Sequence, residues 1–294
     1  MFDFEALYEA QSVPHAIELL RQHPKARIIA GGSDLLIKIR NGEECGLELV
    51  SIYTLNELRG VSIMEDGTLR ILPLTSFSHI IKSPVIQEHF SVLAQALSQA
   101  GGPQIRNIAT IGGNICNGVT SADSASTLLA WDARLEITGP SGVRRLHIGD
   151  FYLGAGKVDL RPAEILTAIL ISRESYSGYF GRYIKYAMRE AMDIATVGCS
   201  VNVKLSEDKK TISDVRVAFG VTGPVPRRAP AAEAAARGMP ASMETVEEFA
   251  AAVREDITPR TSWRATREFR THIAEEIAKR ALIESIKLAG GELA

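Results

Sequence analysis

The sequence predicts an α+β protein of two domains, and three observations support this prediction. The 294 residues exceed the roughly 100–200 residues of a typical single domain. Strands and helices alternate near the N-terminus and hairpins follow, whereas three strands and then helices fill the last third. We therefore predict an N-terminal domain of residues 1–175, with subdomains of about 1–57 and 58–175, and a C-terminal domain of residues 176–294.

The first subdomain is predicted from a helix followed by two short apolar strands. Residues 14–23 carry apolar side chains at helical spacing, and Pro24 ends this helix. Residues 27–30 and 48–52 are apolar runs of strand length. Together they indicate a small β-α-β unit.

The second subdomain contains two hairpin signals. The first lies in residues 61–72, and the second turns through Gly139-Pro-Ser-Gly142 within residues 134–148. Residues 90–97 show helical periodicity that ends at Gly101-Gly102, and residues 164–171 form an apolar strand. This mixture indicates a second α+β unit.

The C-terminal domain is predicted as a three-stranded sheet followed by helices. A polar, Gly/Ser/Tyr-rich stretch at 172–181 joins it to the preceding domain. The expected strands are 183–188, 197–205 and 212–219. Thr245 and Glu248 form a capping-box pattern that predicts a helix start, and a second helical pattern covers residues 272–288.

Charge and composition exclude several classes of protein. With 33 Lys and Arg against 35 Asp and Glu, the formal charge of −2 gives no electrostatic footprint for nucleic acid. The three cysteines are widely spaced and odd in number, which argues against a disulfide framework and fits a reducing compartment. The start lacks a secretory signal pattern, and no apolar run approaches the roughly 20 residues of a membrane span. We therefore expect a cytoplasmic protein without a membrane partner.

The first candidate binding segment is Gly31-Gly-Ser-Asp34, which directly follows a buried strand. Residues without Cβ let backbone amides converge on an anionic group, and the Ser33 hydroxyl adds a donor. The alternative is a tight turn from strand to helix without a ligand.

The second candidate segment runs from Gly101 to Gly118 and is unusually rich in small residues, amides and hydroxyls. Within it, Thr110, Gly112, Gly113 and Asn114 are suited to wrap a phosphate or pyrophosphate. Asp123 is better suited to accept hydrogen bonds from ribose hydroxyls. The alternative is a structural turn with a helix N-cap at Ser121 or Asp123.

Familiar phosphate-binding motifs are absent from the sequence. It contains no G-x-x-x-x-G-K-[ST], and the run that begins at Gly154-Ala-Gly156 has Asp159 where the third glycine of a dinucleotide fingerprint belongs. If a dinucleotide binds, the two glycine segments must therefore hold it together.

At these residues the sequence resembles the FAD-binding medium subunits of the molybdenum hydroxylases, and most closely those of bacterial xanthine dehydrogenases. The resemblance spans nearly the whole chain. It is carried by residues 30–36 (Ala-Gly-Gly-Ser-Asp-Leu-Leu), 101–118 with Ser121-Ala-Asp123, 186–194, and 256–270 with Ser262-Trp-Arg-Ala265.

The resemblance implies a two-subdomain FAD-binding domain of the vanillyl-alcohol-oxidase/PCMH type, followed by a three-stranded antiparallel sheet with a helix bundle. It implies that both glycine segments hold the pyrophosphate, that Asp123 bonds the nucleotide's sugar, and that Leu166 lies near the isoalloxazine. The implied cofactor-binding residues are Ile28, Ile29, Ala30, Gly31, Gly32, Ser33, Asp34, Leu35, Thr110, Gly112, Gly113, Asn114, Asp123 and Leu166.

The resemblance also implies a role in electron transfer. FAD would be bound without a covalent link, electrons would arrive from two [2Fe–2S] clusters of a small subunit, and NAD⁺ would accept them. The molybdenum cofactor would belong to a large partner subunit, which selects the substrate. We expect no acid–base catalyst and no metal ligand in this chain, because the chemistry belongs to the cofactor and the six histidines show no metal spacing.

Three alternatives remain open from the sequence. The chain is a flavin-free scaffold subunit, a free-standing flavoenzyme, or the flavin subunit of a related aldehyde, CO or heteroaromatic dehydrogenase. The run 260–270 with Trp263 and Phe269 suits either RNA stacking or docking of a partner subunit, and the neutral net charge favours the partner.

Some residues have two interpretations each. A first group of two tyrosines and two methionines lies either beside the flavin or in the core. Two arginines contact either phosphate or solvent. Thr196 is a weaker site candidate, in a segment that approaches the cofactor in relatives. The first group is Tyr183, Tyr186, Met188 and Met192, and the arginines are Arg106 and Arg189.

Overall fold

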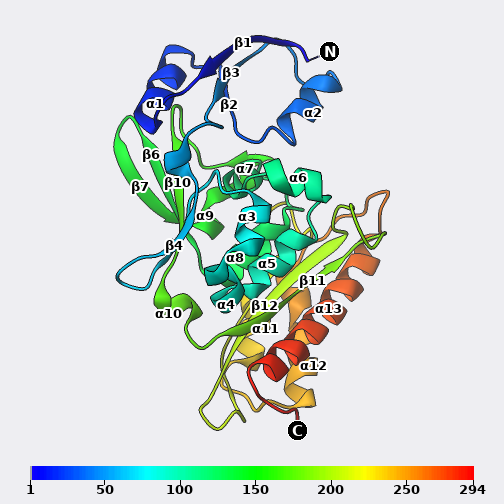
Figure 1. Cartoon of the computed structure of the whole chain (residues 1–294). Helices are drawn as coiled ribbons and strands as arrows, with labels where there is room; N and C mark the ends of the chain where they lie inside the picture. The colour runs from blue at the N-terminus through cyan, green and yellow to red at the C-terminus, as the bar shows by residue number, and fades with distance from the viewer. Residues whose placement is uncertain (1) are drawn as a thin grey trace.

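The computed structural model describes residues 2–294 and confirms an α+β architecture. Three sheets of three or more strands follow one another along the chain, and each has its own buried apolar cluster. In Figure 1 the N-terminal sheet lies at the top, a helix-rich middle part lies below it, and the C-terminal part lies at the lower right. The arrangement places the middle part between the other two.

The first sheet is parallel, with strand order β1-β3-β2. Helix α1 starts where the Ser12 hydroxyl accepts a hydrogen bond from the His15 amide. Strand β1 was not predicted, whereas the helix and the other two strands are confirmed. The elements are β1 (Phe4–Glu9), α1 (Val13–Gln22), β2 (Arg27–Ile29), α2 (Leu35–Arg40) and β3 (Leu47–Ser51).

The second sheet has the order β4-β5-β10-β6-β7, with antiparallel neighbours throughout. Both predicted hairpins and the predicted apolar strand are confirmed. The strands are β4 (Val61–Ile63), β5 (Leu69–Ile71), β6 (Arg134–Gly139), β7 (Gly142–His147) and β10 (Ile165–Ile171), with a small separate pair β8 (Tyr152–Gly154) and β9 (Lys157–Val158).

Short helices fill the space beside this second sheet. The side chains of Phe90, Trp131 and Phe151 are fully buried among them, and the rings of Phe90 and Trp131 meet edge to face at 5.4 Å. The helices are η1 (Asn56–Leu58), α3 (Phe77–Lys82), α4 (Pro84–His89), α5 (Ser91–Ser98), α6 (Pro103–Ile108), α7 (Ile111–Cys116), α8 (Asp123–Ala130), α9 (Ile148–Phe151) and α10 (Arg173–Tyr176).

The glycine-rich segment 101–118 is not one loop, as its composition suggested, but contains α6 and α7. Pro103 opens α6, where its fixed φ and missing N–H are tolerated. The Thr110 hydroxyl caps α7 by accepting a hydrogen bond from the Gly113 amide at 3.2 Å. Helix α8 begins at Asp123 after Ala122, so neither Ser121 nor Asp123 is the N-cap residue.

The third sheet has the order β11-β12-β13-β14 and is antiparallel. The three predicted strands are confirmed, and the two-residue strand β14 adds a fourth. The alternation along β12 directs Val197, Cys199 and Val201 into the apolar cluster shared with the C-terminal helices. The elements are β11 (Phe180–Tyr186), β12 (Val197–Leu205), β13 (Ile212–Gly220), β14 (Arg227–Arg228), α11 (Pro230–Ala236), α12 (Met243–Asp256) and α13 (Arg267–Leu288).

Helix α12 begins earlier than the capping-box pattern predicted. Its N-cap is Ser242, whose hydroxyl accepts a hydrogen bond from the Thr245 amide, and Thr245 itself is buried inside the helix. The helix start predicted from Thr245 and Glu248 was therefore wrong by one turn, because Ser242 supplies a capping hydroxyl three residues earlier.

The two faces of the third sheet have different partners. Helix α13 lies along β11 and β12 on one face (Figure 1), whereas α5 and α8 pack on the other. Thr120, just before α8, joins the two parts by accepting from the Val221 amide and donating to the Gly223 carbonyl. The residues before α8 are thereby fixed against the C-terminal part.

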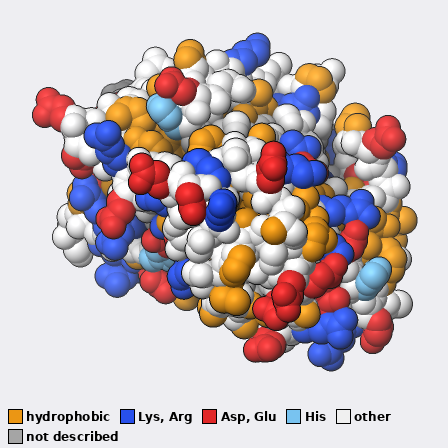
Figure 2. Space-filling view, turned by 90° about the horizontal axis from the view of Figure 1, so that it is seen from below, with side chains coloured by type: hydrophobic (Ala, Val, Ile, Leu, Met, Phe, Trp, Pro, Cys, Tyr) orange, Lys and Arg blue, Asp and Glu red, His pale blue; other side chains and the backbone are white. Residues whose placement is uncertain are grey.

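The described surface carries mixed charge. Figure 2 shows Lys and Arg side chains interspersed with Asp and Glu over the face seen from below. Both signs alternate closely there, as the formal charge of −2 leads one to expect. Among residues 2–294, no helix is long and apolar enough to cross a membrane.

Candidate functional site

The first glycine segment lies at the carboxyl end of the parallel sheet, between β2 and α2. Gly32 has φ of +70°, a conformation that side-chain-bearing residues rarely adopt. Within residues 2–294, the backbone amides of Gly31, Gly32, Ser33 and Asp34 donate to no other backbone group. Four consecutive free amides around a left-handed residue form a concavity that suits an anion.

The second glycine segment is in direct contact with the first. A Cβ at Gly31 would lie 1.9 Å from the carbonyl oxygen of Ile108, at the end of α6. Only a glycine permits this approach, so the contact explains why the second residue after β2 has no side chain. The structure thus brings the two segments together, although about 75 residues separate them in the chain.

The two glycines of α7 have different surroundings. Gly112 is buried against Pro73, to which its amide donates at 2.8 Å, and a Cβ there would lie 2.5 Å from Pro73 Cβ. Gly113 is exposed, and a Cβ there would meet only the Thr110 hydroxyl within 4 Å. Gly112 therefore sets the packing of α7, whereas Gly113 leaves open space beside it.

Asn114 and Asp123 are joined through the start of α8. The Asn114 side-chain oxygen accepts a hydrogen bond from the Ser124 hydroxyl at 2.6 Å. This bond orients the amide so that its NH₂ group is left as a donor. The arrangement fits the directional amide predicted for Asn114.

Asp123 belongs to a buried polar cluster between α8 and β11. Its carboxylate accepts hydrogen bonds from the Tyr183 hydroxyl at 2.7 Å and from the Lys185 ammonium at 3.1 Å. Burial raises the pKa of the Asp123 carboxyl, and Lys185 and Tyr183 oppose that shift. Burial, together with the neighbouring Asp123, also raises the pKa of Tyr183 well above its usual value.

Lys185 is the residue of this site that the sequence did not reveal. The side chains of Lys185 and Asp123 are 5% and 9% exposed, so the pair is nearly shielded from water. The ammonium also donates to the Gln99 carbonyl at 3.0 Å. A single lysine in a strand of alternating burial shows no pattern that marks it as part of a site. Its partner Asp123 lies 62 positions earlier, so their pairing could not be predicted from the sequence.

We predict that Lys185→Met lowers the free energy of unfolding by about 3 kcal/mol, because it leaves a buried carboxylate without its cation. Chemical denaturation of the purified chain measures this loss. The double variant Asp123→Asn/Lys185→Met removes both charges and should recover at least half of it. Equal losses in the single and double variants would show that the pairing contributes nothing.

A cavity of about 330 Å³ opens beside this pair. Its wall consists of Gln99, Lys185 and the residues from Tyr186 to Asp193. The wall also touches the second glycine segment, because a Cβ on Gly102 would lie 3.6 Å from the Met192 thioether. The wall of the cavity at Met192 therefore lies against the start of the second glycine segment.

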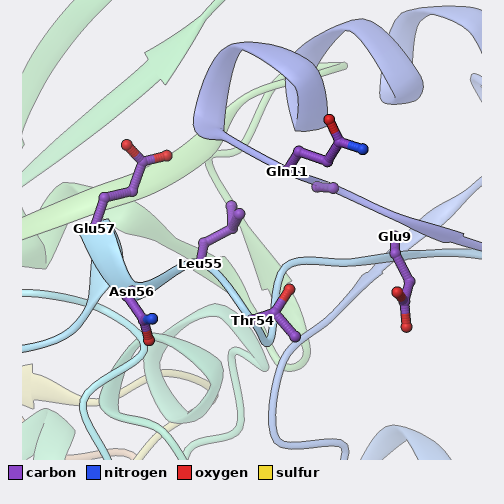
Figure 3. A pocket seen from close by; sticks show the side chains of 7 residues that line it. Glu9, Gln11, Thr54, Leu55, Asn56 and Glu57 are labelled. Atoms are coloured by element: carbon purple, nitrogen blue, oxygen red, sulfur yellow. The ribbon is translucent and has the colours of Figure 1, made fainter.

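A larger cavity of about 460 Å³ lies at the carboxyl end of β1 and beyond β3. Figure 3 shows Glu9 and Glu57 at opposite ends of it, with Gln11 across from Thr54 and Leu55. Two carboxylates repel phosphate, and neither glycine segment lines this cavity. The larger cavity therefore lacks the features expected of a site for a dinucleotide.

The remaining predicted cofactor residues lie around the first segment, apart from Leu166. Leu166 is 4% exposed in the core of the middle part, on β10. Four residues around the first segment are partly buried and lie on β2, directly after it or at the start of α2: Ile28, Ile29, Ala30 and Leu35. Their contacts with a cofactor stay predictions.

Other candidates have definite environments. Tyr183 is buried, whereas Met188 and Met192 are 58% and 65% exposed and so do not fill the core. Arg106 is half-buried, and its guanidinium donates to the carbonyls of Ala100 and Gly101. Within residues 2–294, no group of three or more His, Cys, Asp or Glu side chains is arranged to hold a metal ion.

Comparison with known proteins identifies the family. The family described as "FAD binding domain in molybdopterin dehydrogenase" matches residues 2–173, and the "CO dehydrogenase flavoprotein C-terminal domain" matches residues 182–285. The chain belongs to the FAD-binding subunits of the molybdenum hydroxylases. It is an oxidoreductase component, and the free amides and the Gly31 contact fit the pyrophosphate of the FAD that this family binds.

Individual members of the family cover the whole chain. A putative xanthine dehydrogenase FAD-binding subunit of Escherichia coli K12 is 43% identical, over 100% of both chains. A nicotinate dehydrogenase FAD-subunit of Eubacterium barkeri is 33% identical, over 84% of both. A solved carbon monoxide dehydrogenase from Hydrogenophaga pseudoflava superposes with a TM-score of 0.91 and 30% identity, covering 98% of both chains.

Proposed function

We propose that this chain is the FAD-binding electron-transfer subunit of a xanthine dehydrogenase-like complex, in which [2Fe–2S] clusters of a partner subunit donate electrons and NAD⁺ accepts them. The contact between Gly31 and Ile108 carries the proposal, because it joins two glycine segments into one cradle. The full-length 43% identity to a xanthine dehydrogenase subunit, against 33% for a nicotinate dehydrogenase subunit, favours xanthine among the substrates of the family.

The residues of this chain have binding and orienting roles. The free amides of Gly31 to Asp34 bind the pyrophosphate, and Gly113 and Asn114 approach it from the side of α7. When bound, FAD supplies the redox chemistry through its isoalloxazine ring. Lys185, held by Asp123, places a positive charge beside the 330 Å³ cavity, where it would act on a flavin bound nearby. No residue of this chain is proposed to exchange a proton with substrate.

The partners and the location of the protein belong to the same proposal. A large subunit holds the molybdenum cofactor and selects the substrate, and a small subunit holds the [2Fe–2S] clusters. We propose that the complex is cytoplasmic. We also retain the division of the chain into residues 1–175 and 176–294, and we assign Asp123 and Leu166 to the sugar and the ring of the flavin nucleotide.

The first test is the cofactor content of the purified chain. We expect yellow protein whose flavin is released by acid and identified as FAD, since the cradle holds the cofactor without a covalent bond. Absorption spectroscopy and chromatography of the released flavin measure this. Colourless protein that does not bind added FAD would instead support a flavin-free scaffold.

The second test concerns the donor and the acceptor. Anaerobic NADH should bleach the flavin of the purified chain, and affinity purification from the native host should recover a molybdenum subunit and an iron–sulfur subunit. Substrate screening of that complex then identifies the substrate. Oxidation of a small molecule by the isolated chain alone would indicate a free-standing flavoenzyme.

A further inference from the structure

Residues 187–194 lie on the surface, yet one of their side chains is buried. Met188, Met192 and Ile194 are 58%, 65% and 51% exposed, so the segment has little apolar packing of its own. The side chain of Asp193, in contrast, is only 6% exposed. Because a carboxylate is rarely buried without partners, its contacts indicate what holds this segment.

The Asp193 carboxylate accepts hydrogen bonds from the backbone of its own segment. One oxygen accepts from the amides of Met188 and Arg189, at 2.9 and 3.1 Å. The other accepts from the amide of Ile194 at 2.9 Å. A single side chain therefore closes the turn from residue 188 to residue 194.

The same carboxylate ties this turn to a distant part of the chain. The Arg264 guanidinium lies 3.5 Å from it, and the Arg264 side chain is 20% exposed. The Arg264 guanidinium also lies over the exposed ring of Trp263, with 4.3 Å between the guanidinium carbon and the ring centroid. The other arginine in reach, Arg189, is 69% exposed and so contributes a weaker, solvent-screened contact.

The turn also forms most of the wall of the 330 Å³ cavity beside Lys185. Met192 lies at its tip with φ of +55°, a strained conformation for a side-chain-bearing residue, and it contacts Gly102. The Arg189 guanidinium also donates to the Met192 carbonyl at 2.9 Å, but Arg189 is 69% exposed, so water competes for this bond. Asp193 thus supplies the three hydrogen bonds of the cavity wall that are made by a buried side chain.

We propose that Asp193, fixed by Arg264, is a positioning residue that holds residues 187–194 as the wall of the cavity and so limits access of solvent and electron acceptor to it. The structural part of this inference stands on the contacts of Asp193 alone. Its consequence for the flavin rests on the proposed function.

Limited trypsin digestion of the full-length chain tests the structural part. In Asp193→Asn, the amide replaces one accepting oxygen by a donor and removes the charge opposite Arg264. We expect cleavage after Arg189 to become about tenfold faster, because proteolysis follows local opening. Mass spectrometry of the fragments identifies the cleavage site.

A matched control comes from the β12–β13 turn. The Asp208 carboxylate likewise accepts from its own turn, from the Ser206 hydroxyl and the Lys210 amide, but it lies at the opposite end of β12 from the cavity wall. Asp208→Asn should leave cleavage after Arg189 unchanged. Unchanged cleavage after Arg189 in Asp193→Asn would overturn the inference.

Iodide quenching of flavin fluorescence tests the consequence. In the FAD-loaded chain, Asp193→Asn should raise the quenching constant about twofold at unchanged FAD content, and Arg264→Lys, which keeps the charge, should raise it less than Arg264→Met. Equal quenching in the wild type and in Asp193→Asn would refute the role in access. Failure of both proteins to retain FAD would refute the proposed function, while the trypsin result would still decide the structural part.

Discussion

Gly113→Val is expected to lower the affinity of the chain for FAD by at least about 100-fold, or about 2.7 kcal/mol, while the fold persists. A Cβ at Gly113 would lie 2.9 Å from the Thr110 hydroxyl, which caps α7 and must shift, but it would meet nothing else within 4 Å, so the fold can accommodate the new side chain. The two added methyl groups would occupy the space in which the pyrophosphate is proposed to approach Asn114. Titration of the apoprotein with FAD, followed by fluorescence, measures the loss.

The control for this variant is Gly154→Val. Gly154 also has open space around its Cβ position and no positive φ, but it lies in the β8–β9 hairpin, away from both glycine segments. Gly154→Val should unfold at nearly the wild-type denaturant concentration, Gly113→Val should lose about 1 kcal/mol through the displaced Thr110 cap, and only Gly113→Val should lose FAD. Wild-type affinity in Gly113→Val would show that the pyrophosphate does not approach this face of α7.

Features that depend on local pattern were predictable from the sequence. The hairpins around Glu65-Asp66-Gly67 and Gly139 to Gly142 combine turn residues with flanking apolar strands, and both are present. The joint use of two glycine segments followed from the failure of either to match a complete phosphate motif. The contact of Gly31 with Ile108 agrees with that reasoning.

Features with a weak local signal were missed. Strand β1 alternates between exposed and partly buried residues, so its sequence has no apolar core to reveal it, and only pairing with β3 makes it a strand. Helices α6 and α7 were hidden by their glycines. The high glycine content of residues 101–118 indicated a loop, although Pro103 and Thr110 are residues typical of helix starts.

Contacts between residues far apart in the chain could also not be predicted from the sequence. The position of Asp123 was predicted, but its pairing with Lys185 arises only when β11 packs beside α5 and α8. Asp193 lay in a segment already associated with the cofactor, and its role depends on Arg264, 71 residues later. Polar pairs that join separate elements are fixed by tertiary packing rather than by spacing.

Gly31→Ala is expected to lower the free energy of unfolding by about 4 kcal/mol and also to abolish FAD retention. The new methyl group would lie 1.9 Å from the Ile108 carbonyl oxygen, which is far inside van der Waals contact. Ile108 cannot easily move away, because the next residue, Ala109, donates to the Ile105 carbonyl at 2.7 Å and accepts from the Phe77 amide at 3.1 Å. The two glycine segments must therefore separate.

This double effect distinguishes Gly31 from Gly113, because the first glycine is required by a contact within the protein and the second by the space left for the cofactor. Denaturation of the apoprotein measures the first effect, and FAD titration at a denaturant concentration where the variant stays folded measures the second. Gly154→Ala, with open space at its Cβ position, should show neither. A Gly31→Ala protein with wild-type stability and wild-type FAD affinity would mean that the segments do not touch in solution, and the shared cradle would then have no structural basis.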